Sequence, residues 1–297
     1  MAPAPEASND AVGALFARLM RFIGTTRELS MSRDPFPWAA LERLVHEVAD
    51  ELTRSDDLFW LTHRALPAAN ADYLAVHQSR VAVIALRLAC GLGYDGRRLR
   101  ELGMATCLFD VGLWELPESV VRQADPLSPR TQDRYRSHPQ LSAALVRRWG
   151  PPSEVIVDAV LQHHEREQGQ GYPQGLKGAA VHPDAKIIGL ADTYAALTAP
   201  PPPRLGRPAH EAIREIVRSQ HRVFDPVLIK ALLAETTLFP PGTPVRLSSG
   251  EIGRVVALNH HHPLRPRIEV MTKPPAAPHT IDLADAPFLY ITGPVAT

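Results

Sequence analysis

The sequence predicts a mainly α-helical protein that ends in a small β-rich segment. Apolar residues recur at helical spacing from about residue 11 to residue 236, and prolines interrupt the pattern at several points. After the PPGTP stretch at 240–244, the pattern changes to short runs of β-branched residues broken by Ser-Gly and Asn-His turns. The chain has 297 residues, enough for a sizeable core and one to three domains.

The N-terminal region is expected to contain a short tail and two amphipathic helices. Residues 1–10 are predicted to be a disordered tail, and residues 11–66 a helical region in which Pro35 and Pro37 separate two helices. One apolar stripe runs along each helix: Val12, Leu15, Leu19 and Phe22 in the first, and Leu41, Leu44, Val45 and Val48 in the second. Because no catalytic constellation is visible here, we expect a helical extension or a partner-binding bundle.

Residues 67–238 contain most of the polar residues that could carry chemistry. Helical patterns cover 71–92, 97–110, 128–135, 138–149, 153–166, 184–199, 208–221 and 225–236. The PPPPR stretch at 200–204 ends one of these helices, since proline lacks an N–H donor and clashes with the preceding turn.

Residues 239–297 are expected to form a small β-rich segment. His260–His262 are expected in an exposed hairpin turn of this segment rather than at a metal site, because neighbouring side chains at a strand end diverge.

Charge and cysteine content limit the classes of partner. Thirty-two Lys and Arg balance thirty-two Asp and Glu, so no net positive charge draws the chain to nucleic acid or to an anionic membrane. A small ligand or a protein is therefore the expected partner.

Cys90 and Cys107 lie in apolar helical patterns and are expected to be buried free thiols. The N-terminus has no signal-peptide pattern and no apolar run is long enough to span a bilayer, so the chain is predicted to be cytoplasmic.

Several acidic and imidazole side chains fall on the apolar faces of the predicted helices, where such groups are rare. They are His77, Asp110, His163, His164 and Asp192. A buried aspartate is almost always paired or bound to a metal, and imidazole with carboxylate ligands suits iron, manganese and zinc. Two such ions can share a bridging carboxylate and activate a water molecule for attack on a phosphoester. A helical core in which these groups satisfy one another without a metal is the alternative.

Two histidines are adjacent in the sequence, and their directions matter for the predicted site. On a helix, His163 and His164 would point about 100° apart. They are therefore expected to serve two neighbouring sites, or one site and a substrate oxygen. The next residue, Glu165, is expected to pair with a basic neighbour such as Arg166 or Lys186.

The stretch HHEREQGQGYPQGLKG at 163–178 narrows the choice of function. It is followed by Ala191-Asp192 and then by Ala196-Leu197-Thr198. This order and spacing resemble the HD-GYP domains, a branch of the HD-type metal phosphohydrolases, which carry HHE, GxGYP and GLKG motifs and later an AD before an ALT segment. The resemblance extends across residues 67–238, and the β-rich segment after residue 240 is similar to the tail found in many family members.

The resemblance implies a helical bundle of the HD type, a site for two or three metal ions, and hydrolysis of cyclic di-GMP to the linear dinucleotide pGpG or to GMP. By position, it implies a metal-ligand set of His77, Asp110, His138, His163, His164 and Asp192. In that set Asp110 bridges two ions and acts as the catalytic residue that helps to activate the water. The ligand-binding residues that the resemblance suggests are Gly171, Tyr172, Lys177 and Arg204.

The chain departs from the family pattern at the HDxGK signature, which reads FDVGL at 109–113. Phenylalanine has no lone pair, so Phe109 cannot be a metal ligand. Leu113 stands where the family has a lysine that faces a phosphate, and losing one such donor typically costs ~10²–10³ in rate. Pro201 and the two prolines after it replace most of an RPYR-like segment, of which only Arg204 remains. Tyr73 replaces a family glutamate, which argues against a third ion.

These departures leave two functions to weigh. In the first, the domain keeps one or two ions, of iron or manganese, but catalyses weakly or not at all. It then binds cyclic di-GMP, a related cyclic dinucleotide or a protein partner, through the loop around Tyr172 or through the N-terminal helices. In the second, the domain is an active phosphodiesterase that hydrolyses cyclic di-GMP. The first is preferred because the losses fall on positions that contact metal or phosphate, and whether the chain is an enzyme stays open.

Overall fold

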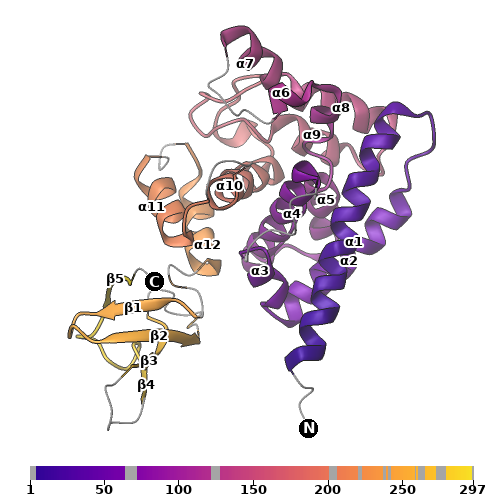
Figure 1. The fold of residues 1–297 in the computed structure, drawn as a ribbon. Helices are drawn as coiled ribbons and strands as arrows, with labels where there is room; N and C mark the ends of the chain where they lie inside the picture. The colour runs from indigo at the N-terminus through magenta and orange to yellow at the C-terminus, as the bar shows by residue number, and fades with distance from the viewer. Residues whose placement is uncertain are drawn as a thin grey trace.

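The computed structural model describes the chain at residues 5–63, 72–121, 128–200, 206–219, 223–236, 239, 242–257, 259, 265–271 and 279–295. It is mainly helical, as predicted, with a small sheet at its C-terminal end (Figure 1). The α-helices are α1 (Pro5–Met31), α2 (Trp38–Arg54), α3 (Asp57–Leu61), α4 (Tyr73–Gly91), α5 (Gly96–Thr106), α6 (Glu118–Val121), α7 (Pro129–Arg136), α8 (His138–Arg148), α9 (Glu154–Gln162), α10 (Pro183–Thr198), α11 (Ala209–Ser219) and α12 (Pro226–Glu235). Two short 3-10 helices are η1 (Val111–Glu115) and η2 (Gly178–Ala180).

The two predicted N-terminal helices are present and bury the predicted stripes. The four apolar positions named on α2 are buried, and on α1 Val12 and Leu19 are buried while Leu15 and Phe22 pack against the core from its edge. Helix α1 begins at Pro5, so the tail predicted over residues 1–10 is too long. Proline suits the start of a helix, because the first N–H groups have no partner within the helix.

One hydrophobic core runs from α1 to α12. Helix α4 is at its centre: fifteen of its nineteen residues are buried, and it packs against α1, α2, α5, α10 and α12 (Figure 1). Burying a large aliphatic side chain contributes about 1.5–3 kcal/mol. The predicted boundary near residue 66 therefore does not separate two cores, and the N-terminal helices stabilise the rest of the helical body.

Polar contacts also join the N-terminal helices to later ones. Arg87 on α4 pairs with Asp56, next to α3, at 2.7 Å and with Glu235 on α12 at 2.6 Å. His63, shortly after α3, shares a hydrogen bond of 2.9 Å with the Tyr194 hydroxyl group on α10. The segment that follows α3 is thus hydrogen-bonded to helix α10.

The C-terminal segment forms a five-stranded antiparallel sheet with its own small core, as the sequence predicts. The strand order is β4–β3–β2–β1–β5, with β1 (Pro244–Leu247), β2 (Ile252–Ala257), β3 (Arg267–Val270), β4 (His279–Asp282) and β5 (Ile291–Pro294). Alternate residues of the central strands are buried, among them Val245, Leu247, Val255, Ile268 and Val270. The predicted turn at His260–His262 lies outside the described residues.

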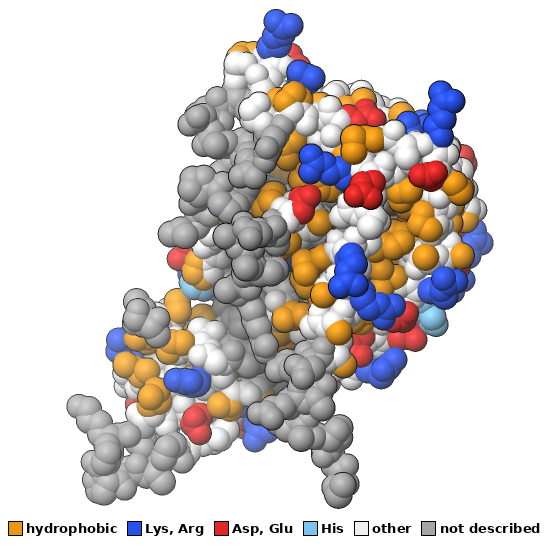
Figure 2. Space-filling view, turned by 45° about the vertical axis from the view of Figure 1, so that its right-hand side comes forward, with side chains coloured by type: hydrophobic (Ala, Val, Ile, Leu, Met, Phe, Trp, Pro, Cys, Tyr) orange, Lys and Arg blue, Asp and Glu red, His pale blue; other side chains and the backbone are white. Residues whose placement is uncertain are grey.

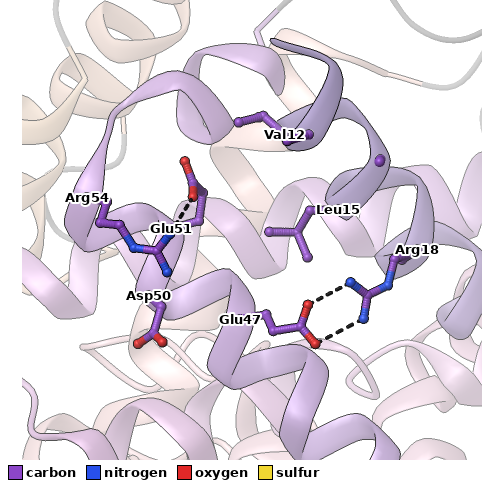
Figure 3. A pocket seen from close by; sticks show the side chains of 9 residues that line it. Val12, Leu15, Arg18, Glu47, Asp50, Glu51 and Arg54 are labelled. Carbon is purple, nitrogen blue, oxygen red and sulfur yellow. Dashed lines mark hydrogen bonds and ion pairs between the residues drawn. The ribbon is translucent and has the colours of Figure 1, made fainter. Parts of the chain in front are cut away.

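A groove of about 470 Å³ lies between α1 and α2 (Figure 3). Arg18 crosses it and donates two hydrogen bonds to Glu47, at 2.6 and 3.0 Å. None of the candidate metal ligands lines this groove, so the predicted chemistry lies elsewhere. On the face shown in Figure 2, Lys and Arg alternate with Asp and Glu among hydrophobic side chains, in agreement with the balanced charge.

Two further sequence predictions can be compared with the fold. Cys90 and Cys107 are free thiols, and Cys107 is fully buried whereas Cys90 is partly exposed. Within the described part of the chain, no helix combines the length and the apolar character that a membrane span requires.

Candidate metal centre

The candidate ligands come from five separate segments that the fold brings together. His77 lies on α4, Asp110 directly before η1, His138 at the start of α8, His163 and His164 directly after α9, and Asp192 on α10. Two predicted helices, 97–110 and 153–166, end earlier, at Thr106 and Gln162. Asp110 and the adjacent histidines therefore lie in turns, where the 100° helical offset does not apply, and the rings of His163 and His164 lie only 4.2 Å apart.

Three imidazoles converge on one point. The Nε2 atom of His138 lies 3.2 Å from Nε2 of His163 and 3.1 Å from Nε2 of His164. The Nδ1 atoms of His138 and His163 each lie 2.7 Å from a backbone carbonyl oxygen, that of Tyr135 and of Val160 respectively. A carbonyl oxygen only accepts hydrogen bonds, so in both rings Nδ1 carries a proton, and Nε2 carries a lone pair when the ring is neutral. Outer hydrogen bonds of this kind orient metal-binding histidines.

Asp110 places a carboxylate beside two of these imidazoles. Its Oδ1 atom lies 3.1 Å from Nε2 of His138 and 3.6 Å from Nε2 of His163. The residue is only 4% exposed, and no donor among the described residues makes a hydrogen bond of regular geometry to Oδ1. A buried oxygen among imidazole lone pairs is costly without a cation. The three imidazoles could together hold a divalent metal ion, with Asp110 beside two of them. We call His138, His163, His164 and Asp110 the imidazole cluster.

The electrostatics of the imidazole cluster agree with a metal-binding role. Burial alone would raise the pKa of Asp110, but the neighbouring His138 and His163 outweigh it and hold that pKa below its ordinary value. Burial, together with the nearby His163 and His138, holds the pKa of His164 well below its ordinary value. A deprotonated carboxylate and a neutral imidazole are the forms that bind metal. His164 differs in one respect, since its Nδ1 faces the donor Arg166 at 3.5 Å instead of a carbonyl.

His77 and Asp192 form a second group, which we call the ion-pair side. Nε2 of His77 lies 2.8 Å from Oδ1 of Asp192, with 6% and 15% of the two side chains exposed. Burial lowers the pKa of His77, but Asp192 outweighs it and the net shift is upward. The two predicted ligands therefore satisfy each other directly, although Nδ1 of His77 has no hydrogen-bond partner among the described residues.

Phe109 contacts both groups. Its ring lies 5.0 Å from the ring of His163 and 6.4 Å from the ring of His77, and its side chain is fully buried. Leu113 is 3% exposed. The two positions at which the family signature has an imidazole and a lysine are thus occupied by buried apolar side chains.

Gly112 determines how closely η1 approaches α8. A Cβ atom at this position would lie 2.6 Å from the carbonyl oxygen of His138 and from the backbone nitrogen of Ser142. The backbone N–H of Gly112 donates a hydrogen bond of 2.8 Å to the Ser142 hydroxyl group. Without a side chain at 112, the chain can bring Asp110 against the first residue of α8.

Aromatic rings cover the histidines, and this was not predicted. Tyr73 stacks on His77 at 5.6 Å, and Tyr172 stacks on His164 at 4.6 Å. The ring of Tyr135 packs against His138 at 4.9 Å. The guanidinium group of Arg136 lies 5.3 Å from the centre of the Tyr172 ring. The only signal in the sequence for Tyr135 and Arg136 is their position shortly before His138.

The loop that carries the GYP motif is fastened to the cluster by Glu165. Its carboxylate accepts hydrogen bonds from three backbone N–H groups, those of Gln174 (2.6 Å), Gly175 (3.1 Å) and Leu176 (2.9 Å). The expected pairing of Glu165 with a basic neighbour is wrong, and Lys186 pairs with Glu167 instead, at 2.8 Å. A buried carboxylate is equally well stabilised by several backbone donors.

Three predicted ligand-binding residues belong to this loop, and others lie elsewhere. The N–H of Tyr172 donates to the carbonyl oxygen of His164 at 3.2 Å, and a Cβ atom at Gly171 would collide with that same carbonyl. The loop therefore lies directly on the imidazole cluster. Lys177 is exposed and its side chain passes close to Gly169. Arg204 and Pro201 lie outside the described residues.

Comparison with known proteins agrees with this geometry. The HD domain family model matches residues 63–228, and the model of the KOW domain associated with HD domains matches residues 244–297. A cyclic di-GMP phosphodiesterase of Pseudomonas aeruginosa is 31% identical over 219 residues, which are 72% of this chain and 53% of that protein. The cyclic di-GMP phosphodiesterase response regulator RpfG of Xanthomonas campestris is 32% identical over 157 residues, or 52% of this chain and 41% of that protein.

Two other comparisons concern a relative with a different substrate and a solved structure with the same fold. A 3'3'-cGAMP-specific phosphodiesterase of Vibrio cholerae is 28% identical over 139 residues, or 44% of this chain and 30% of that protein. The chain thus spans about half or less of the length of these relatives. The solved structure of an HD-GYP-type protein from Bdellovibrio bacteriovorus matches the fold with a TM-score of 0.63 at 18% identity, covering 74% of this chain and 70% of that one. The chain belongs to the metal-dependent HD domain family and carries the HHE and GYP motifs of its HD-GYP branch.

Proposed function

We propose that the chain is a metal-binding HD-GYP-type domain that binds a cyclic dinucleotide and hydrolyses it weakly or not at all. The observation that carries this proposal is the buried ring of Phe109, which contacts both ligand groups at the position of a family ligand. A hydrocarbon ring offers no lone pair, and on one side of it His77 and Asp192 already pair with each other. The domain then holds one ion firmly and a second one weakly or not at all.

The ion is held by the imidazole cluster. Nε2 of His138, His163 and His164 and Oδ1 of Asp110 are the donor atoms, and the carbonyl oxygens of Tyr135 and Val160 hold two of the rings in position. Iron or manganese suits this set of nitrogen and oxygen ligands. Such an ion, when bound, supplies a positive charge for a phosphate oxygen and acidifies a bound water molecule.

Two observations support a cyclic dinucleotide as the ligand: the substrates of the relatives and the aromatic ring of Tyr172 beside the imidazole cluster. Curated relatives are phosphodiesterases of cyclic di-GMP and of 3'3'-cGAMP, and both ligands combine phosphodiesters with flat bases. The ring of Tyr172, on the loop that Glu165 fastens, offers a stacking surface beside the imidazole cluster. Its N–H is already bonded to His164, so the ring of Tyr172 is held at a fixed place for a base or a ribose.

An active phosphodiesterase is the second candidate. It is favoured by the geometry around Asp110, whose Oδ1 lies within 3.6 Å of two imidazole nitrogens while its neighbour Phe109 is in contact with His77. In that case Asp110 would link the two ligand groups, and the missing cation at Leu113 would cost ~10²–10³ in rate. The two candidates share the metal and the ligand, and they differ only in turnover.

Three measurements on the full chain test the proposal. Metal analysis of the protein as isolated should find iron or manganese, and calorimetry should detect binding of cyclic di-GMP at micromolar concentration. With manganese or ferrous iron added, turnover should be ~10²–10³ below that of the Pseudomonas aeruginosa relative under the same conditions. Equal turnover would establish the second candidate, whereas no metal and no dinucleotide binding would eliminate both.

A further inference from the structure

We propose that Arg136, beside the ring of Tyr172, is a phosphate-binding residue at the edge of the metal centre. The inference deepens the proposed function, on which it rests, because it assigns to this chain a cation for the phosphodiester that the sequence lacks at Leu113. Its ligand class is a phosphate monoester or diester.

Three side chains, of His164, Tyr172 and Arg136, lie next to one another at the edge of the imidazole cluster. The ring of Tyr172 stacks on His164 at 4.6 Å with an interplanar angle of 22°, and the guanidinium carbon of Arg136 lies 5.3 Å from the centre of the same Tyr172 ring. The ring of Tyr172 is also 6.4 Å from the ring of His138. Arg136 is therefore one side chain away from two of the proposed metal ligands.

The donors of Arg136 are free for a ligand. It is the last residue of α7, two residues before His138, and it is exposed. Its guanidinium group lies over the Tyr172 ring, and within the described part of the chain its N–H groups donate to no carboxylate or carbonyl oxygen. Those donors form a planar fork that matches two oxygens of a phosphate. The donors of Arg136 are therefore available to phosphate oxygens at the edge of the site.

Two other cations near the site, Arg166 and Lys186, are already engaged. Arg166 donates to the carbonyl oxygens of His163 and Glu165, at 2.8 and 2.9 Å. Lys186 is paired with Glu167 at 2.8 Å. The carboxylates of Asp110 and Asp192 are close to imidazoles and do not pair with Arg136. Among the described residues placed around the cluster, Arg136 is thus the arginine that can take up a phosphate without breaking another contact.

The experiment compares four full-length proteins: the wild type, Arg136→Gln, Arg136→Lys and the matched control Arg134→Gln. Arg134 is exposed on the same helix and carries the same charge, so the control corrects for net charge. The probe is inorganic phosphate, and its affinity is read from the broadening of its ³¹P resonance on binding to a 32.6 kDa chain. Cyclic di-GMP, measured by calorimetry, is the second probe.

Arg136→Gln should weaken phosphate binding about tenfold or more, Arg136→Lys should weaken it less, and Arg134→Gln should stay within about twofold of the wild type. Thermal melting and metal content should be unchanged in all three variants. The proposal is overturned if the wild type does not bind phosphate, or if Arg136→Gln and Arg134→Gln weaken binding equally. Phosphate binding that depends on Arg136, without any binding of cyclic di-GMP, would overturn the proposed function and leave this inference standing.

Discussion

The imidazole cluster and the ion-pair side have the same kinds of ligand but a different balance of donors and acceptors. In the cluster, two Nδ1–H groups are used by backbone carbonyls, so Nε2 lone pairs and a carboxylate oxygen face one another. On the ion-pair side, His77 and Asp192 neutralise each other at 2.8 Å. The first arrangement suits a bound cation, whereas the second is already paired. Phe109 lies in contact with both, 5.0 Å from the ring of His163 and 6.4 Å from the ring of His77.

The largest expected effect comes from breaking the imidazole cluster. His163→Ala should lower metal affinity by more than the ~10–100-fold that is typical for loss of an outer-shell partner, because it removes a donor atom itself. Metal content after dialysis, measured by mass spectrometry, would show this. His46→Ala, at an exposed position on α2, is the control and should keep the wild-type content. Equal metal content in His163→Ala and His46→Ala would mean that the imidazole cluster does not hold the metal.

The second prediction restores the missing imidazole. Phe109→His should lower the free energy of unfolding in the absence of metal by ~2 kcal/mol or more, since a polar ring replaces a buried aromatic one. Added manganese should raise the melting temperature of this variant more than that of the wild type, because a second ion can then be bound.

Phe109→Leu is the matched control, because it is apolar and provides no ligand. It should lose stability without any extra response to manganese. If Phe109→His responds to manganese no better than Phe109→Leu, the ring at 109 is not what prevents the second ion from binding.

The third prediction concerns the approach that aligns Asp110 with His138. A methyl group in Gly112→Ala would lie 2.6 Å from backbone atoms of α8, so we expect a loss of about 3 kcal/mol in urea unfolding, at the upper end for overpacking. Metal affinity should fall as well. Gly13→Ala on α1 is the control, because nothing lies within 4 Å of its added methyl group, and it should stabilise the helix by ~0.5–1 kcal/mol.

The smallest expected effect concerns His63, which is hydrogen-bonded to α10, the helix that carries Asp192. Burial lowers the pKa of His63 to about 4 from its ordinary 6.5, while Tyr194 on α10 shares a hydrogen bond with its ring. Since the folded-state pKa lies below the unfolded value, the neutral ring contributes stability above about pH 6.5 that is lost as the pH falls toward 4. At pH 5 the loss is about 2 kcal/mol.

His63→Gln removes this titration and keeps an amide that can both donate and accept. The fall in unfolding free energy between pH 7 and pH 5 should therefore be about 2 kcal/mol smaller in this variant than in the wild type. His46→Gln on α2 serves as the reference. An unchanged pH dependence in His63→Gln would show that the His63 ring is not held neutral by the fold.

The helical part of the fold could be predicted because its pattern is strong. The stripes on α1 and α2 and most helices between residues 73 and 235 follow from apolar spacing and proline positions. The ends of α5 and α9 could not, since apolar spacing continues past Thr106 and Gln162 into turns.

The local sequence around the site was informative to different degrees. The motifs identified the candidate ligands, because a motif is defined by residue types and their order in the sequence. They did not reveal the role of Glu165, whose three partners are backbone N–H groups nine to eleven residues away. They also did not reveal Arg136, which matters only because Tyr172 folds back over His164.

The sequence by itself determined the helical class and the β-rich C-terminal segment, and it supplied the candidate ligands and the phenylalanine at 109, where the family resemblance implies an imidazole. Only the tertiary structure decided how those ligands are grouped: three imidazoles with Asp110, and His77 with Asp192. The physical reason is that a ligand's role depends on where its lone pairs point and on which donors are nearby. Those directions are set by turns, by close backbone approaches and by side chains that meet across more than a hundred residues of chain, as those of His77 and Asp192 do.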